Sequence, residues 1–128
     1  MLCHGDLHGE NLLVRNGDVV AVLDWELAQF GPPELDVART ALILSTLPGI
    51  GAIPSRLLAP MGRRSARAFV AAYARRRAVD SRTLEWYDVL HAARALAVSR
   101  EQSRVGNQWR PLQSRLQRRI ARRIGRST

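Results

Sequence analysis

The sequence predicts a single domain of the α+β class in which helices predominate. Two short apolar runs, at residues 12–14 and 19–23, flank a turn-forming cluster and predict one β-hairpin. From Pro32 onward, apolar residues recur at helical spacing and predict four or so helices. A chain of 128 residues can bury one hydrophobic core but is short for two lobes. We therefore expect one hairpin followed by a helical subdomain.

The hairpin is the first expected element. Leu12-Leu13-Val14 and Val19 to Leu23 are aliphatic or β-branched, and Arg15-Asn16-Gly17-Asp18 between them favours a tight turn. Asn11 would precede the first strand and Asp24 would follow the second. Because a hairpin reverses the chain, these two side chains should lie close together.

The first helix is expected to begin at Pro32-Pro33-Glu34, because proline is tolerated in a first helical turn and a carboxylate is favoured there by the helix dipole. Residues 35–47 are apolar almost all round, so this helix should be buried, and Pro48-Gly49 should end it. Asp36 stands out in this run as a carboxylate between two apolar neighbours.

Three more helices are expected at residues 60–77, 81–104 and from Pro111 onward. Asp80 or Ser81 is suited to cap the start of the second of these. The last helix is rich in arginine, and its apolar residues form a narrow stripe at intervals of four: Leu112, Leu116, Ile120 and Ile124.

Three polar residues near the hairpin occur in the order that phosphoryl transfer requires. In kinases an Asp receives the proton of the attacking hydroxyl, an Asn a few residues later binds magnesium, and a second Asp after a later strand binds the magnesium that bridges the nucleotide phosphates. Asp6, Asn11 and Asp24 fit these roles. Any one of them alone would be explained as well by the turn-forming habit of Asp and Asn. Their combination with a hairpin favours a kinase.

The motifs His4-Gly5-Asp6 with Asn11, and Asp24-Trp25-Glu26, resemble those of the aminoglycoside phosphotransferase and choline kinase family. This family phosphorylates hydroxyls of small molecules on a protein-kinase-like fold. Gly5 stands where protein kinases usually carry Arg, and Trp25-Glu26 stand where they carry Phe-Gly. Both departures favour the branch that acts on small molecules, such as aminoglycosides or amino alcohols.

The resemblance is strong over about residues 2–38 and implies the C-terminal catalytic lobe of that fold. Residues 2–26 would form the catalytic loop and metal-binding hairpin, and residues 32–128 the helical subdomain, within one domain of residues 1–128. The implied cofactor is Mg²⁺ with ATP or GTP as phosphoryl donor.

The resemblance also implies supporting residues. His4 would hold the catalytic loop by hydrogen bonds, and Asp36 would brace the same loop, although a simple helix N-terminal charge explains Asp36 equally well. Glu26 would assist metal or substrate binding, with a capping role as the alternative. A zinc site that pairs His4 with the histidine four residues later is disfavoured, because glycines interrupt a helix there and the chain has a single Cys.

Two features of kinases are missing from the sequence. All twenty basic residues are Arg, so no Lys can pair with the nucleotide phosphates, and no Gly-rich segment precedes the catalytic motif. Gly49-Ile50-Gly51 resembles such a segment, but it follows the catalytic residues and Pro54 stands where a third Gly would fall. We therefore expect the N-terminal, nucleotide-clamping lobe to be absent from this chain, to be supplied in cis or in trans, and the isolated chain to be inactive.

The uneven charge of the chain supports an alternative function. Residues 1–62 hold three Arg and seven acids, whereas residues 63–128 hold seventeen Arg and four acids. A non-catalytic module could use the Arg-rich C-terminal helix to bind nucleic acid, anionic lipid or an acidic partner. However, the aromatic residues do not alternate with the arginines as single-strand binders require, so nucleic acid is not the expected partner.

The remaining features predict a cytoplasmic protein. One Cys excludes a disulfide framework, and no apolar run reaches the roughly 18 residues of a membrane span. The N-terminus also lacks the basic and then apolar layout of a secretion signal. No membrane partner is expected.

Overall fold

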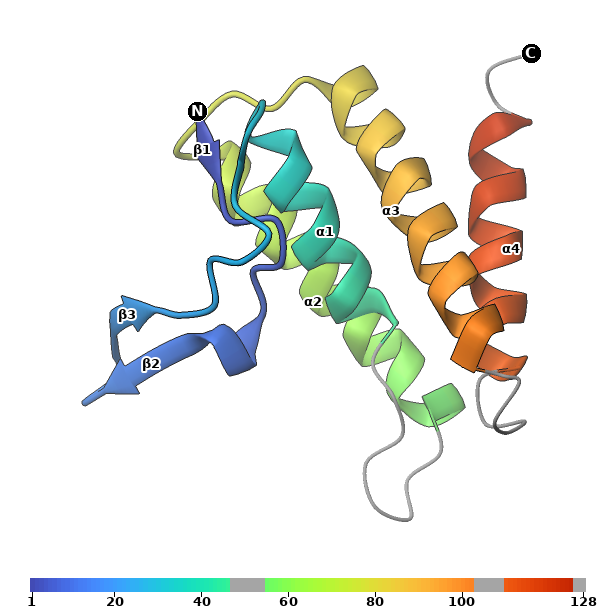
Figure 1. The fold of residues 1–128 in the computed structure, drawn as a ribbon, viewed down its shortest axis with the longest axis horizontal. Helices are drawn as coiled ribbons and strands as arrows, with labels where there is room; N and C mark the ends of the chain where they lie inside the picture. Colours follow the sequence, from blue (N-terminus) through green and yellow to red (C-terminus); the bar gives the residue numbers. More distant parts are fainter. Residues whose placement is uncertain (47–54, 103–109, 126–128) are drawn as a thin grey trace.

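A computed structural model describes residues 1–46, 55–102 and 110–125. A small strand-rich region at the start of the chain leads into four helices in the described part (Figure 1). The elements, in order, are β1 (Leu2–Cys3), a 3-10 turn (Gly9–Asn11), β2 (Leu12–Arg15), β3 (Asp18–Val22), β4 (Gln29–Phe30), α1 (Glu34–Ser45), α2 (Ser55–Ala74), α3 (Ser81–Gln102) and α4 (Arg110–Ile124). The predicted α+β class with a helical majority is confirmed.

Strands β2 and β3 form the expected antiparallel hairpin, which projects away from the helices (Figure 1). Arg15 pairs with Asp18 across a two-residue turn, in which Asn16 and Gly17 have φ values of +53° and +88°. Two positive φ values are typical of a type I′ turn, whose twist matches that of the strands, and Asn-Gly adopts it at low cost. The turn is tighter than the four-residue cluster in the sequence suggested.

A second strand pair, β1 with β4, was not predicted from the sequence. Leu2 pairs with Phe30 and Cys3 with Gln29 in antiparallel register. Strands of two residues are too short to show an alternating pattern, so only the tertiary structure reveals them. Their pairing places the chain that enters α1 beside the segment that precedes the catalytic motif.

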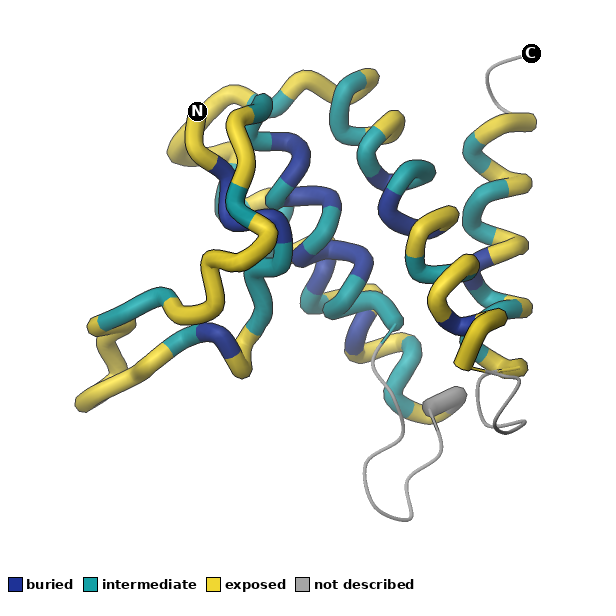
Figure 2. The backbone as a smooth tube through the Cα atoms, viewed as in Figure 1, coloured by how far each residue is buried: buried dark blue, intermediate teal, exposed yellow. Residues whose placement is uncertain are grey.

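Helix α1 is the centre of the fold. It lies between α2 and α3, and α4 packs on the far side of α3 (Figure 1). Its buried residues include Leu35, Val37 and Leu42, which confirms the burial predicted for this segment (Figure 2). Leu42 also packs with Ala92 of α3 and Leu116 of α4 in one hydrophobic cluster. The helices therefore share a core that begins at α1.

The predicted start of α2 was wrong. The helix begins at Ser55, five residues before Pro60, and Pro60 lies inside it. Proline in a helix interior removes one hydrogen bond and usually disfavours helix, so its position inside α2 goes against the local preference of the sequence. The residues from Ser55 to Ala59 are compatible with a helix and extend it backward. At its other end α2 stops at Ala74, three residues before the predicted end.

Helices α3 and α4 begin close to the predicted residues. Asp80 caps α3, because its Oδ1 accepts a hydrogen bond from Thr83 N–H at 2.7 Å. Hydrogen bonding from the Thr83 side chain, and then from its N–H group, lowers the pKa of the Asp80 carboxyl. The predicted end of α3 at Arg104 lies outside the described residues. Within the described ranges, no helix is long and apolar enough to cross a membrane.

Polar contacts join α1, α3 and α4. Arg119 of α4 forms a bidentate pair with the buried Asp88 of α3, with N–O distances of 2.6 to 3.0 Å. Its remaining nitrogen donates to Ser45 Oγ at the end of α1 at 2.7 Å. Arg123 pairs with Asp88 at 3.3 Å and with Glu85 at 2.5 Å. These contacts satisfy a buried carboxylate that would otherwise be costly.

Candidate active site

The candidate site is built on one face of α1. Asp36, in the first turn of this helix, accepts hydrogen bonds from two consecutive backbone N–H groups. His4 N–H donates to Oδ2 and Gly5 N–H donates to Oδ1, each at 2.7 Å. Hydrogen bonds to a carboxylate are shorter and stronger than neutral ones. The segment in which the sequence predicted a catalytic loop is therefore fastened to α1.

Two more side chains of α1 hold the same loop. Arg39 Nε donates to Asp6 Oδ1 at 2.9 Å, and Arg39 Nη2 lies 2.8 Å from the same oxygen. Thr40 Oγ1 donates to the carbonyl oxygen of Leu7 at 2.8 Å. Because Asp36, Arg39 and Thr40 are three and four positions apart, they share one face of the helix.

Neither Arg39 nor Thr40 was predicted as a site residue from the sequence. The available signal was their spacing: they are polar residues in an otherwise apolar helix, at the positions i+3 and i+4 from Asp36. We call Asp36, Arg39 and Thr40 the α1 clamp.

His4 links the loop to the residue that precedes Asp24. Its ring is buried, with Nε2 2.7 Å from the Leu23 carbonyl oxygen, and Asp6 N–H donates to its Nδ1 at 3.3 Å. Because Nδ1 accepts, Nε2 carries the proton and donates it to Leu23. The ring centroid also lies 4.7 Å from that of Trp25. His4 therefore has the contacts of a structural residue within the loop.

Asn11 is buried at the end of the 3-10 turn, directly before β2, and contacts both predicted motifs. Its side-chain nitrogen donates to the Asp6 carbonyl oxygen at 3.0 Å, and its own backbone carbonyl accepts from Leu23 N–H at 2.8 Å. With the amide nitrogen committed to Asp6, the amide oxygen is the atom that could bind a cation. The hairpin thus brings Asn11 next to the chain that leads into Asp24, as its turn predicted.

Asp24 follows β3 in the left-handed region of backbone space, with φ of +62°, and its side chain is exposed. Asp and Asn tolerate this region better than other residues with a side chain, but such a conformation is uncommon and often marks a functional position. Glu26 is exposed in the turn that follows. It does not begin a helix, so the alternative capping role for Glu26 is wrong.

Gly5 allows the loop after Asp24 to approach the catalytic loop. Its φ is +83°, and a Cβ on this residue would lie 2.3 Å from the carbonyl oxygen of Leu27. No side chain can occupy that space, since the nearest atom belongs to the backbone. The departure from Arg noted in the sequence therefore has a local steric reason.

The Asp6 carboxylate is hydrogen-bonded at one oxygen, and its other oxygen has no hydrogen bond from a side chain or backbone group of the described residues. Arg39 occupies Oδ1, whereas Oδ2 lies 3.7 Å from His8 Nε2, and the side chain of Asp6 is 24% exposed. A carboxylate with one oxygen fixed and the other accessible can orient a hydroxyl and accept its proton.

A cavity of about 370 Å³ lies beside the loop. Gly5 and Arg39 contribute from the loop and its clamp, and His91 and Arg94 contribute from α3, with no acid among the described lining residues. His91 is buried, and its Nε2 lies 3.0 Å from the Leu35 carbonyl oxygen. Burial lowers the pKa of His91, more than its hydrogen bond raises it.

The donor set at the hairpin fits magnesium and not a transition metal. Asn11 and Asp24 offer hard oxygen ligands, and Mg²⁺ needs only one or two protein oxygens in addition to substrate phosphates. The described residues contain no group of three or more His, Cys, Asp or Glu side chains able to hold a metal.

The chain forms an α+β lobe of the kinase-like type, in which the predicted catalytic loop is held against a helix and a hairpin carries an amide and a carboxylate. A model of the phosphotransferase enzyme family matches residues 1–79, which is more than half of the chain, and the chain belongs to this family. The resemblance seen in the sequence is thereby confirmed.

One curated relative is acyl-CoA dehydrogenase family member 11 of Rattus norvegicus. It is 34% identical over 90 residues, which cover 66% of this chain and 11% of the relative. The chain thus spans about a tenth of the length of that protein. No solved structure was found to match the chain significantly.

Proposed function

We propose that this lobe transfers the γ-phosphoryl group of ATP or GTP to a hydroxyl of a small molecule. Membership of the phosphotransferase enzyme family supports the reaction class. The observation that carries the proposal is the α1 clamp, which fixes Asp6 by one oxygen. Asp6 follows Gly5 in the chain and is paired with Arg39, and both Gly5 and Arg39 line the cavity.

In this mechanism Asp6 orients the acceptor hydroxyl and takes its proton. The acceptor oxygen forms a bond to the γ-phosphorus, the bond from that phosphorus to the β–γ bridging oxygen breaks, and the proton passes from Asp6 to solvent. Nucleoside diphosphate leaves. Phosphoryl transfer depends mainly on positioning and charge stabilisation, so a base held in place by Arg39 suits it.

Asn11 and Asp24 would hold the magnesium that accompanies the nucleotide, and Glu26 would assist from the adjacent turn. When bound, the metal would neutralise charge on the β- and γ-phosphates. His4 holds Asp24 close to Asp6, since its ring donates to the carbonyl of the residue before Asp24 and accepts from Asp6 N–H.

We place the acceptor in the cavity between the catalytic loop and α3. The sequence led us to expect an amino sugar or an amino alcohol. The cavity presents Arg39, Arg94 and His91, which favours an acceptor with a neutral or anionic group near the hydroxyl and disfavours an ammonium group there. The name of the rat relative refers to an acyl-CoA dehydrogenase, but the match covers only 11% of that protein, so we propose no dehydrogenase chemistry.

A second lobe would complete the nucleotide site, in cis or in trans. Exposed apolar side chains are concentrated in the strand-rich part of the chain: Leu2, Leu13, Val14, Val19, Val20, Leu23, Trp25, Leu27 and Phe30. Phe30 alone is 86% exposed. Patches of this kind usually mark interaction surfaces, and a nucleotide-binding lobe docked here would cover Asp24 and exclude water.

The proposal is tested by assaying two proteins with labelled ATP or GTP and magnesium. One is the 128-residue chain, and the other is the product of the longest reading frame that contains it. Acceptors are tested in two panels, one of neutral and acidic alcohols and one of amino sugars and amino alcohols. We expect product only from the longer protein and mainly with the first panel. Product from neither protein with either panel and either nucleotide would contradict the proposed reaction.

A further inference from the structure

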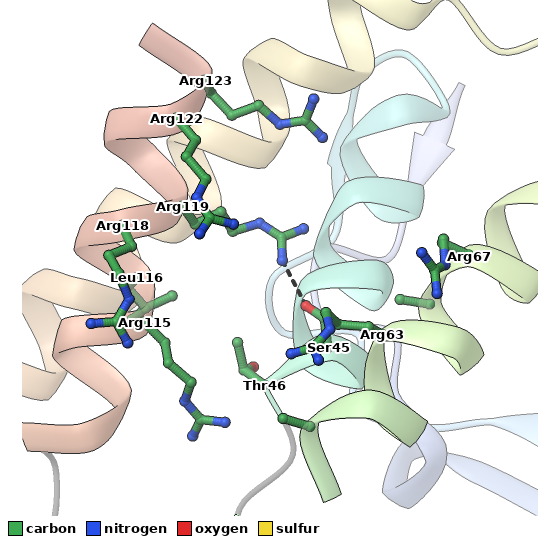
Figure 3. Close-up of a pocket in the computed structure, with 12 residues that line it drawn as sticks. Ser45, Thr46, Arg63, Arg67, Arg115, Leu116, Arg118, Arg119, Arg122 and Arg123 are labelled. Carbon is green, nitrogen blue, oxygen red and sulfur yellow. Dashed lines mark hydrogen bonds between the residues drawn. The ribbon is translucent and has the colours of Figure 1, made fainter. Parts of the chain in front are cut away.

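A second, larger cavity lies between α2 and α4, at the C-terminal end of α1 (Figure 3). Its volume is about 620 Å³, within the range of small-molecule sites. Ser45 and Thr46 border it at the end of α1, and it shares no described lining residue with the catalytic loop or with the cavity beside it. Nothing in the proposed phosphoryl transfer uses this cavity.

The lining is strongly cationic. Seven arginines contribute to it: Arg63 and Arg67 from α2, and Arg115, Arg118, Arg119, Arg122 and Arg123 from α4. All eleven acids of the sequence lie within the described residues, and none of them lines the cavity. Figure 3 shows guanidinium groups extending from both helices into the space between them.

Only two of these arginines have a carboxylate partner in the part of the chain that the structure describes. Arg119 and Arg123 pair with Asp88 and Glu85 of α3. The other five, Arg63, Arg67, Arg115, Arg118 and Arg122, form no ion pair with a described residue. The cavity therefore gathers like charges that repel one another, which costs stability unless an anion offsets them.

Arg115 provides an independent observation. Its Nε and Nη1 atoms are buried, and neither has a hydrogen-bond partner within the described residues. Burial, and then the charge of Arg118, lower the pKa of the Arg115 guanidinium. Buried donors are normally paired, so two unpaired donors on one guanidinium indicate an acceptor that the chain itself does not supply.

We propose that this cavity binds a compact polyanion with at least two phosphate groups. Arginine forks match phosphate oxygens in bidentate geometry, and walls that face each other from α2 and α4 can each bind one phosphate. The hydroxyls of Ser45 and Thr46 already donate to the Leu42 carbonyl oxygen, which leaves the arginines to recognise the ligand. The described lining contains no aromatic residue, which argues against single-stranded nucleic acid as the occupant.

The site is tested by titrating inorganic triphosphate into the 128-residue chain by calorimetry, without divalent cations and at about physiological ionic strength. The variant Arg67→Gln/Arg115→Gln removes one cation from each wall and leaves the Asp88 pairs intact. Its control is Arg64→Gln/Arg110→Gln, which removes the same charge from the same two helices. Both control residues are exposed, and neither lines the cavity.

We expect the cavity variant to bind inorganic triphosphate at least about tenfold more weakly than the control, because it loses charge-assisted hydrogen bonds from both walls. Arg118→Gln/Arg122→Gln serves as a second cavity variant if the first is unfolded by circular dichroism, with the same expected loss. A parallel titration with ADP shows whether the cavity prefers a nucleotide or an inorganic polyphosphate. With either ligand, weaker binding by the cavity variants than by the control supports the site.

Three results would overturn the proposal. The wild-type chain could fail to bind either phosphate compound, or the cavity and control variants could lose affinity equally, as a diffuse charged surface would. Tighter binding of a single-stranded oligonucleotide than of inorganic triphosphate would show that the arginines form a nucleic-acid surface.

Discussion

Asp36→Ala is expected to destabilise the protein through the catalytic loop rather than through the core. The Asp36 carboxylate accepts from His4 N–H and Gly5 N–H at 2.7 Å each, and both residues are buried. An unpaired buried donor costs about 1–3 kcal/mol, so two of them cost about 2–6 kcal/mol. The free energy of unfolding of a domain is about 5–15 kcal/mol, so the loss should be large.

The isosteric variant Asp36→Asn should cost less, about 1–3 kcal/mol, because one side-chain oxygen still accepts while an NH₂ group faces the other donor. Asp18→Asn, at the exposed end of the hairpin turn, is the matched control and should leave the free energy of unfolding unchanged.

Urea unfolding of each variant, followed by circular dichroism, gives these free energies. Amide hydrogen exchange then locates the effect, since His4 and Gly5 should lose protection while the amides of α3 keep it. An Asp36→Ala variant within about 0.5 kcal/mol of the wild type, with His4 and Gly5 still protected, would refute the clamp.

Further variants test the metal ligands, the close contact of Gly5 with the Leu27 backbone, and the effect of pH. Asp24→Ala should weaken magnesium-nucleotide binding in the longer protein more than Asn11→Ala does, because a carboxylate offers a full charge to the metal and an amide only a dipole. Magnesium titrations of the two variants would show equal losses of affinity if the hairpin were not a metal site. Gly5→Ala should disrupt the loop and lower the free energy of unfolding, since its Cβ would lie 2.3 Å from a backbone oxygen. A Cβ at Gly9 would have no atom within 4 Å, so Gly9→Ala should unfold in urea like the wild type. Burial lowers the pKa of His91 in the folded protein below the ordinary value of 6.5, so the unfolded chain takes up the proton first as pH falls. The free energy of unfolding should therefore decrease below about pH 6.5, and His91→Gln should flatten this decrease; an unchanged pH profile would exclude His91 as its source.

The sequence predicted the elements whose signals are local. The hairpin follows from Asn16-Gly17 between apolar runs, and the burial of α1 follows from its nearly continuous apolar composition. The helix that begins at Ser81 follows from the capping ability of Asp80. The closeness of Asn11 to the chain before Asp24 follows from the reversal of chain direction in a hairpin, although their roles as metal ligands stay predictions.

Other features depend on tertiary contacts and could not be predicted in the same way. The β1–β4 pair is only two residues long on each side, and it exists because the chain returns past its own start to enter α1. The sequence predicted that the second helix begins at Pro60, whereas α2 begins at Ser55 and contains Pro60 in its interior. The roles of Arg39 and Thr40 depend on which segment packs against their face of α1, and the steric need for Gly5 depends on the backbone of Leu27.

We propose above that Asp6, held by the α1 clamp, is the base of a phosphoryl transfer. The most direct test is single-turnover phosphorylation by the longer protein, with the acceptor that gives most product in the panels. Asp6→Asn should lower the rate by about 10²–10⁴-fold with little change in nucleotide binding, and Asp18→Asn should leave both unchanged. A near wild-type rate for Asp6→Asn would contradict the account.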